Sequence, residues 1–237
     1  MIFWSEPMFF YYDYYYLILV IPALLISMWA QFKVQSTFNK YSKINASRGY
    51  TAAQITRTIL DDNGLYSVSI ERVSGNLTDH YDPKANVIRL SDSVYNSTSV
   101  AAIGVAAHEA GHAIQHAKQY VPIKIRSAVI PLSQIGSSLS MPLILLGLVF
   151  SFRPLVIGGI ILFSLVSVFQ LVTLPVEFNA SRRALDTLEN REYLYGEELS
   201  GARKTLSAAA MTYVAALLVS LMQLLRLVLL FGRRNND

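Results

Sequence analysis

The chain alternates four long apolar segments with more polar ones. The apolar segments cover about residues 14–32, 127–150, 155–174 and 206–231. Each is close to the ~20 residues that a helix needs to cross a bilayer. Only a short turn at residues 151–154 separates the second segment from the third, so we expect these two to form a hairpin. The pattern therefore predicts four transmembrane helices.

Residues 33–126 are too polar to span a membrane and form the only sizeable soluble part. Hydrophobic periodicity within this part predicts a helix over residues 52–62, strands over 67–73 and 86–91, and a helix over 100–117. We expect strand 86–91 to be an edge strand, which an extended peptide could join through main-chain hydrogen bonds. The alternative is an edge strand that only packs. The predicted fold is an α-helical membrane protein with a small α+β part.

The segments divide the chain into five parts with different tasks. They are an N-terminal transmembrane anchor (1–32), a polar α+β core (33–126), a transmembrane hairpin (127–175), a connecting helix (176–205), and a C-terminal transmembrane helix with its tail (206–237). Aromatic residues 9–16 are typical of a belt at the membrane interface.

Composition agrees with a membrane protein, because hydrophobic residues make up 53% of the chain and the mean hydropathy is +0.37. The net charge of +4 comes largely from basic residues that follow the first span and connect the third to the fourth. The positive-inside rule places these segments in the cytoplasm and the N-terminus outside. The basic C-terminus, with Arg233 and Arg234, is the one contrary signal. The lipid bilayer is the expected partner, and no basic patch calls for nucleic acid.

The pentapeptide His108-Glu109-Ala110-Gly111-His112 lies in the predicted helix 100–117. Residues four apart lie on one face of a helix, so both imidazoles can reach one Zn²⁺ ion, and Glu109 can accept a proton from water. Gly111 lets another backbone segment or a substrate come close. The pattern favours a zinc metallopeptidase, and the alternative is two surface histidines beside a solvated glutamate.

A catalytic zinc ion needs a third protein ligand and an open position for water. His116 lies about 12 Å along the helix from His108, too far to share one ion, so we interpret it as a partly exposed surface residue. Glu177 is the predicted third ligand. Two membrane crossings separate it from the motif, and an even number of crossings returns the chain to the same side. The alternative is an ordinary glutamate in the first turn of a helix.

The connection between the two predicted strands is dense in polar groups, Leu77-Thr78-Asp79-His80-Tyr81-Asp82-Pro83. Part of this is turn chemistry, since aspartate and proline are common turn formers. His80 or Tyr81 could instead donate a hydrogen bond to the oxyanion of a tetrahedral intermediate. We place His80 ahead of Tyr81 as the candidate catalytic donor.

Three segments, residues 77–83, 105–115 and 176–183, give the chain a resemblance to a known group. The chain is similar to the gluzincin metallopeptidases and, within them, to the bacterial membrane-bound neutral zinc metallopeptidases of the YugP-like family. The resemblance spans nearly the whole chain. It implies a multi-pass protein of the bacterial cell membrane with a small gluzincin-like protease core.

The resemblance also implies a set of site residues. It places zinc on His108, His112 and Glu177, with Glu109 as general base and acid. Better-studied membrane gluzincins carry an aspartate four residues after the glutamate ligand, where it supports a zinc-bound histidine, and this chain has Ser181 there. Either Ser181 or Asn179 takes that supporting role, or the support is missing.

The predicted function is a membrane-anchored zinc endopeptidase at the cytoplasmic membrane face, acting on proteins or peptides that include membrane proteins. One alternative is an intramembrane protease of the site-2 type, which carries its motif within a spanning helix. The ends of the motif helix are too polar for that, and no later span contains an aspartate. The other alternative is a membrane scaffold that binds zinc without activity, against which the glutamate of the motif argues.

Overall fold

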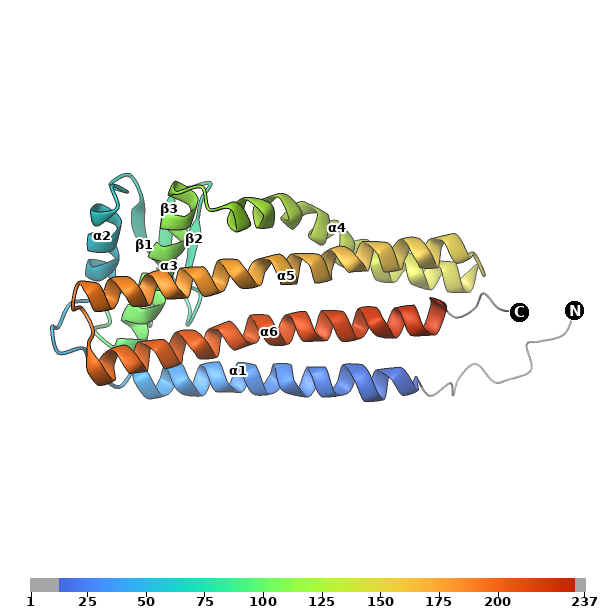
Figure 1. Ribbon diagram of the computed structural model, residues 1–237, viewed down its shortest axis with the longest axis horizontal. Coiled ribbons are helices and arrows are strands. Elements are labelled where there is room, and N and C mark those ends of the chain that lie inside the picture. Colours follow the sequence, from blue (N-terminus) through green and yellow to red (C-terminus); the bar gives the residue numbers. More distant parts are fainter. Residues whose placement is uncertain (1–12, 233–237) are drawn as a thin grey trace, which may run out of the picture.

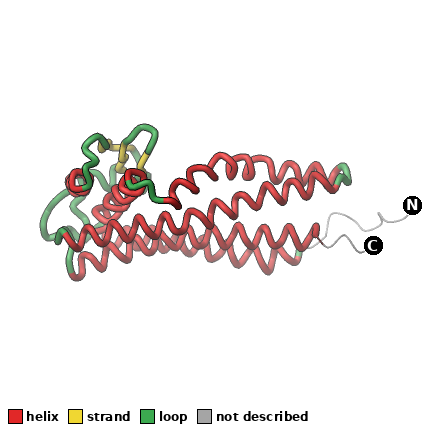
Figure 2. The backbone as a smooth tube through the Cα atoms, turned by 45° about the horizontal axis from the view of Figure 1, so that its top comes forward, coloured by secondary structure: helices red, strands yellow, loops and turns green. Residues whose placement is uncertain are grey.

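The structure is a computed structural model and describes residues 13–232. Residues 1–12 of the predicted anchor, which include most of the predicted aromatic belt, and residues 233–237 of the tail lie outside the described residues. Long helices dominate the described chain (Figure 1). The strands and the shorter helices gather at one end of the elongated molecule (Figure 2).

Four helices in the described range are long and apolar enough to cross a membrane, which agrees with the prediction of four spans. They are α1 (Ile21–Tyr41), which follows the short π-helix η1 (Tyr16–Val20), then α4 (Val121–Val149), α5 (Arg153–Asn190) and α6 (Gly196–Gly232). Helix α6 packs against both α1 and α5, and α4 folds back along the first half of α5 (Figure 1). Helices α4 and α5 are thus the predicted hairpin.

All four of the expected divisions fall inside helices, at residues 32/33 in α1, 126/127 in α4, 175/176 in α5 and 205/206 in α6. Glu177 lies on α5, which continues through Pro175 without a break, and residues 196–205 are already part of α6. Glu177 therefore does not occupy the first turn of a separate helix. A proline in a helix interior costs about 3 kcal/mol. Burial of the apolar side chains of Val176 and Ala180 on either side of Glu177 helps to offset this cost.

The polar part contains a small sheet and two helices, which pack directly against each other. Its elements are α2 (Ala52–Asp62), β1 (Ser69–Val73), β2 (His80–Asp82), β3 (Val87–Ser91) and α3 (Val100–Ala117). Helix α2 begins with a capping box, in which the Thr51 side chain accepts from the Gln54 N–H and the Gln54 side chain accepts from the Thr51 N–H. Ser99 caps α3 by accepting a hydrogen bond from the Ala102 N–H.

The prediction of an edge strand at residues 86–91 is wrong, because β3 is the central strand of the sheet. The order is β1-β3-β2, with β1 parallel and β2 antiparallel to β3. The polar connection at residues 77–83 contains β2, which folds back onto β3 with His80 opposite Arg89. Strand β2 therefore occupies the edge of β3 that we expected to be free. An extended peptide could therefore join only β1 or β2.

Helix α3 lies at the centre of the core. It contacts α2, the sheet, α5 and α6, and nearly all of its residues are buried. Glycines allow this close packing. A Cβ atom at Gly104 would lie 3.3 Å from the Ala202 Cβ on α6, and one at Gly111 would lie 2.8 Å from the Ala180 carbonyl oxygen on α5. The expectation that Gly111 admits another backbone segment is confirmed, and that segment is α5.

Candidate metal centre

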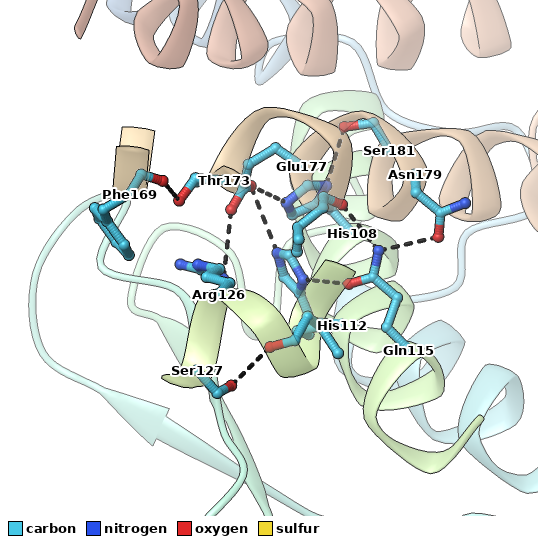
Figure 3. Close-up of polar contacts among 12 residues, drawn as sticks. His108, His112, Gln115, Arg126, Ser127, Phe169, Thr173, Glu177, Asn179 and Ser181 are labelled. Atoms are coloured by element: carbon cyan, nitrogen blue, oxygen red, sulfur yellow. Dashed lines mark hydrogen bonds and ion pairs between the residues drawn. The ribbon is translucent and has the colours of Figure 1, made fainter. Parts of the chain in front are cut away.

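His108 and His112 on α3 converge with Glu177 on α5, although 65 residues separate His112 from Glu177 in the sequence (Figure 3). One ligand atom from each residue lies within 4.8 Å of the other two. The Glu177 Oε2 atom is 3.3 Å from the His108 Nε2 atom and 3.6 Å from the His112 Nε2 atom. The structure thus brings together the three residues that the sequence proposed as ligands.

The chemistry of this cluster fits a zinc ion. Two imidazole nitrogens and one carboxylate oxygen are a donor set that catalytic zinc sites use. The Glu177 side chain is 3% exposed, and its Oε2 atom is buried without a hydrogen-bond partner. An unsatisfied buried acceptor is costly in a folded protein, and a bound cation would satisfy it.

A hydrogen-bond network fixes the ring of His112. Gln115, one turn further on α3, donates from Nε2 to the Val176 carbonyl oxygen at 2.8 Å and to the Asn179 Oδ1 atom at 3.0 Å. Its Oε1 atom consequently faces the His112 Nδ1 atom at 3.0 Å (Figure 3). Nδ1 must then carry the hydrogen, which leaves the Nε2 lone pair free toward Glu177.

His108 has a simpler support. The Ser181 hydroxyl lies 3.1 Å from the His108 Nδ1 atom, where it can accept that N–H group. Ser181 therefore contacts one histidine directly, and Asn179 reaches the other through Gln115. The two residues that the sequence offered as alternatives take separate positions around the cluster.

Two hollows flank the cluster and share five lining residues. Their volumes are about 370 and 280 Å³, and both are lined by Asp79, His108, Glu109, Glu177 and Tyr213. The larger hollow extends between α1 and α6, and the smaller one extends beneath β2 toward α4. Open space therefore lies on both sides of the cluster, and Glu109 borders both spaces.

The two candidate oxyanion donors use their polar groups within the β2 region. The His80 Nδ1 atom lies 2.8 Å from the Thr78 carbonyl oxygen, and its Nε2 atom lies 3.5 Å from the Arg89 guanidinium. The Tyr81 hydroxyl donates to the Asn86 side chain at 3.3 Å. Both residues line the smaller hollow, but no hydrogen bond or ion pair links either to the cluster within residues 13–232.

His116 is outside the cluster, as expected from its distance along the helix. It is half-buried, and its ring packs against the Tyr81 ring with centroids 5.5 Å apart. Burial, followed by the positive charges of His112 and Arg126, lowers the pKa of His116.

The surroundings of the cluster raise the pKa of two groups, His112 and Asp79. Burial alone would lower the pKa of His112, but the close contact of its ring with the Glu177 carboxylate and the charges of Glu109 and Glu177 outweigh it and raise the pKa. Burial raises the pKa of Asp79, and the charge of Glu109 adds to this, although hydrogen bonds from Ser91 act in the opposite direction. The raised pKa favours a proton on His112, and this proton must leave before the imidazole can bind a metal ion.

Sequence reasoning missed three residues at the site. Gln115 had a readable signal, a polar side chain three residues after His112 on a helix otherwise rich in small apolar residues. The Arg126 Nη1 atom lies 3.7 Å from the Glu177 Oε1 atom, although the sequence suggested only a basic residue at the start of a span. Tyr213 sits within an apolar run and carried no signal at all.

Fold and site together define a class, a multi-span membrane protein whose His-Glu-x-x-His helix faces a glutamate on a neighbouring helix. The chain belongs to the family described as "Putative neutral zinc metallopeptidase", whose model matches residues 16–232. It is 50% identical to "Putative membrane protease YugP" of Bacillus subtilis (strain 168) over 223 residues. This aligned region covers 93% of this chain and 99% of the relative. No solved structure matches. The resemblance to the membrane-bound neutral zinc metallopeptidases seen in the sequence is thereby confirmed.

Proposed function

We propose that the protein is a membrane-anchored, zinc-dependent endopeptidase that hydrolyses peptide bonds at the cytoplasmic face of the membrane. The observation that carries this proposal is the convergence of His108, His112 and Glu177, in which the buried Glu177 Oε2 atom faces the Nε2 atoms of both histidines. These three residues would hold the zinc ion. The family description and the printed name of the B. subtilis relative both point to a zinc peptidase.

The zinc ion, when bound, polarises a carbonyl group and lowers the pKa of water. Glu109 follows His108 on α3 and borders both hollows, so it can take a proton from water and return it to the leaving amine. His80, our predicted oxyanion donor, lines the smaller hollow together with Arg126 and Tyr213. We add Tyr213 as a second donor, because its ring also lines the larger hollow beside Glu109 and Glu177.

The length of α5 supports a site at the membrane surface. At a rise of 1.5 Å per residue, the 24 steps from Arg153 to Glu177 span about 36 Å, slightly more than the ~30 Å hydrocarbon core of a bilayer. Glu177 would then emerge just beyond the membrane, and the last turns of α5 would project from it. A substrate segment close to the bilayer, such as a loop of a membrane protein, can reach this position.

Two substitutions test the mechanism. Glu109→Gln should keep zinc but abolish cleavage of an unfolded model protein, because the amide cannot accept the proton. Glu177→Ala should lower the zinc content of the purified protein. Glu189→Gln, an exposed change on the same helix as Glu177, is the matched control and should alter neither quantity. Undiminished cleavage by Glu109→Gln would sink the general-base role, and unchanged zinc in Glu177→Ala would remove Glu177 from the site.

The cytoplasmic orientation has its own test, since the chain contains no cysteine. Tyr66 is 75% exposed in the polar part, and Ser151 is exposed in the turn between α4 and α5. A membrane-impermeant maleimide should label Ser151→Cys on intact cells, and Tyr66→Cys only after the membrane is opened. The reverse pattern would place the site outside the cell.

Two observations favour this proposal over its alternatives. Helix α3 is not among the candidate spans of the described chain, which argues against an intramembrane protease of the site-2 type. Glu109 borders both hollows, an arrangement that a purely structural zinc site does not need. Zinc-loaded protein that cleaves neither unfolded nor membrane-derived substrates would support the inactive scaffold.

A further inference from the structure

A basic hollow lies between α1 and α6, apart from the two hollows at the metal centre. Its volume is about 670 Å³, and four cationic side chains line it, Lys33 and Lys40 from α1 and Arg203 and Lys204 from α6. We propose that this hollow binds the headgroup of an anionic phospholipid.

Within residues 13–232 none of the four cations of this hollow forms an ion pair with a carboxylate, and the lining of the hollow contains no aspartate or glutamate. Hydroxyl groups of Ser36, Thr37 and Ser207 also line the hollow. Four unpaired positive charges around one space repel each other, so an anion that enters it is attracted by all four. Phosphate oxygens would accept hydrogen bonds from both the cations and the hydroxyls.

The position of the hollow along the helices identifies the source of the anion. Lys33 is the first charged residue after the apolar segment of α1, and Lys204 directly precedes the apolar segment of α6. Helices α1 and α6 run side by side (Figure 1), and since Lys33 and Lys204 line the same hollow, both helices change from apolar to basic at the same level. A hollow at that level faces the headgroups of the bilayer, where a basic pocket between spanning helices attracts anionic lipids.

The hollow also offers a surface for the apolar part of a lipid. Ala208 and Met211 continue its lining from Lys204 toward the apolar portion of α6, and the Met211 side chain is 41% exposed. A free phosphate ion would use only the basic end. A phospholipid would use both, with its phosphate between the cations and its acyl chains along α6.

The same two helices form the wall of the metal centre. Val34 and Gln35 of α1, and Leu206 and Ala210 of α6, line the 370 Å³ hollow beside His108. A headgroup that bridges the basic residues of α1 and α6 would thus hold together the helix pair that borders the site. The proposal does not require proteolytic activity, since it concerns lipid binding alone.

Native mass spectrometry of the full-length protein in detergent tests the proposal. The protein is mixed with equal amounts of phosphatidylglycerol and phosphatidylcholine that carry the same acyl chains. Wild type should retain phosphatidylglycerol preferentially. In a variant with all four cations changed to glutamine, the ratio of retained phosphatidylglycerol to phosphatidylcholine should fall by at least about tenfold. One cation near an anionic surface raises the affinity by about fivefold. Equal retention by this variant and wild type would overturn the proposal.

A charge-matched control separates the hollow from general electrostatics. It carries four substitutions outside the hollow with the same loss of net charge, Lys84→Gln, Lys118→Gln, Lys124→Gln and Arg182→Gln. This control should retain the lipid as wild type does, and equal loss in the control would refute a specific site. Excess glycerol 3-phosphate should not displace the lipid, and displacement would refute the lipid as the source. If the fourfold variant does not fold, Lys33→Gln with Arg203→Gln takes its place.

Discussion

Replacing Gly111 with alanine tests whether the approach of α3 to α5 sets the geometry of the metal centre. The added Cβ atom would lie 2.8 Å from the Ala180 carbonyl oxygen and 3.3 Å from its carbonyl carbon. A carbon–oxygen contact is normally no shorter than about 3.3 Å. The backbone of α5 must therefore retreat by about 0.5 Å. Glu177 lies one turn before Ala180 on the same helix, so it moves with that backbone.

Two opposing effects determine the stability of the Gly111→Ala variant. Overpacking of a filled core costs about 1–3 kcal/mol, and alanine in place of glycine improves helix propensity by about 1 kcal/mol. The free energy of unfolding should thus fall by only about 0–2 kcal/mol. Zinc binding should suffer more, because ligand distances tolerate shifts of only about 0.2 Å. We expect zinc affinity to fall by about tenfold or more, the range for changes that disturb the support of metal ligands.

Chelator competition measures the zinc affinity, and thermal unfolding of the detergent-solubilised protein measures stability. Gly158→Ala is the matched control, since a Cβ atom at that position on α5 meets no atom within 4 Å. This control should keep full zinc affinity and unfold at the same or a slightly higher temperature. Wild-type zinc affinity in Gly111→Ala would show that the contact with Ala180 does not position Glu177.

Two further predictions concern the histidines of the metal centre, and one concerns the ion pair between Asp13 and Arg226. Ser181→Ala should weaken zinc binding by about tenfold in the same competition assay, because the His108 Nδ1 atom loses its partner, and an unchanged affinity would contradict this. Asp13→Asn should lower stability by about 3–5 kcal/mol, since it leaves the largely buried Arg226 without its 2.6 Å carboxylate contact, and unchanged thermal unfolding would rule this out. Zinc affinity should fall as pH drops through the raised pKa of His112, since protonation blocks the ligand nitrogen, and equal affinities at pH 8 and pH 6 would count against it.

Several features followed from the sequence because they depend on neighbouring residues only. An apolar run of about 20 residues suffices to predict a spanning helix, whatever it packs against. Four-residue spacing places His108 and His112 on one face of α3, since helical geometry repeats every 3.6 residues. The prediction of Glu177 as third ligand required one step more, a count of membrane crossings. That count placed Glu177 on the same side of the membrane as His108 and His112.

Tertiary structure decided the features that depend on residues far apart in the chain. The pattern of apolar and polar residues in β3 could not show that β1 and β2 would cover both of its edges. Strand pairing joins segments that are separate in the sequence, and a local pattern does not relate them. The same holds for Gln115, whose amide connects His112 with the backbone of α5. Sequence alone determined the spans, the motif helix and the three proposed ligands. Only the packing of α3 against α5 and α6 decided their distances, their hydrogen-bond supports and the hollows beside them, because these contacts join helices that local periodicity cannot relate.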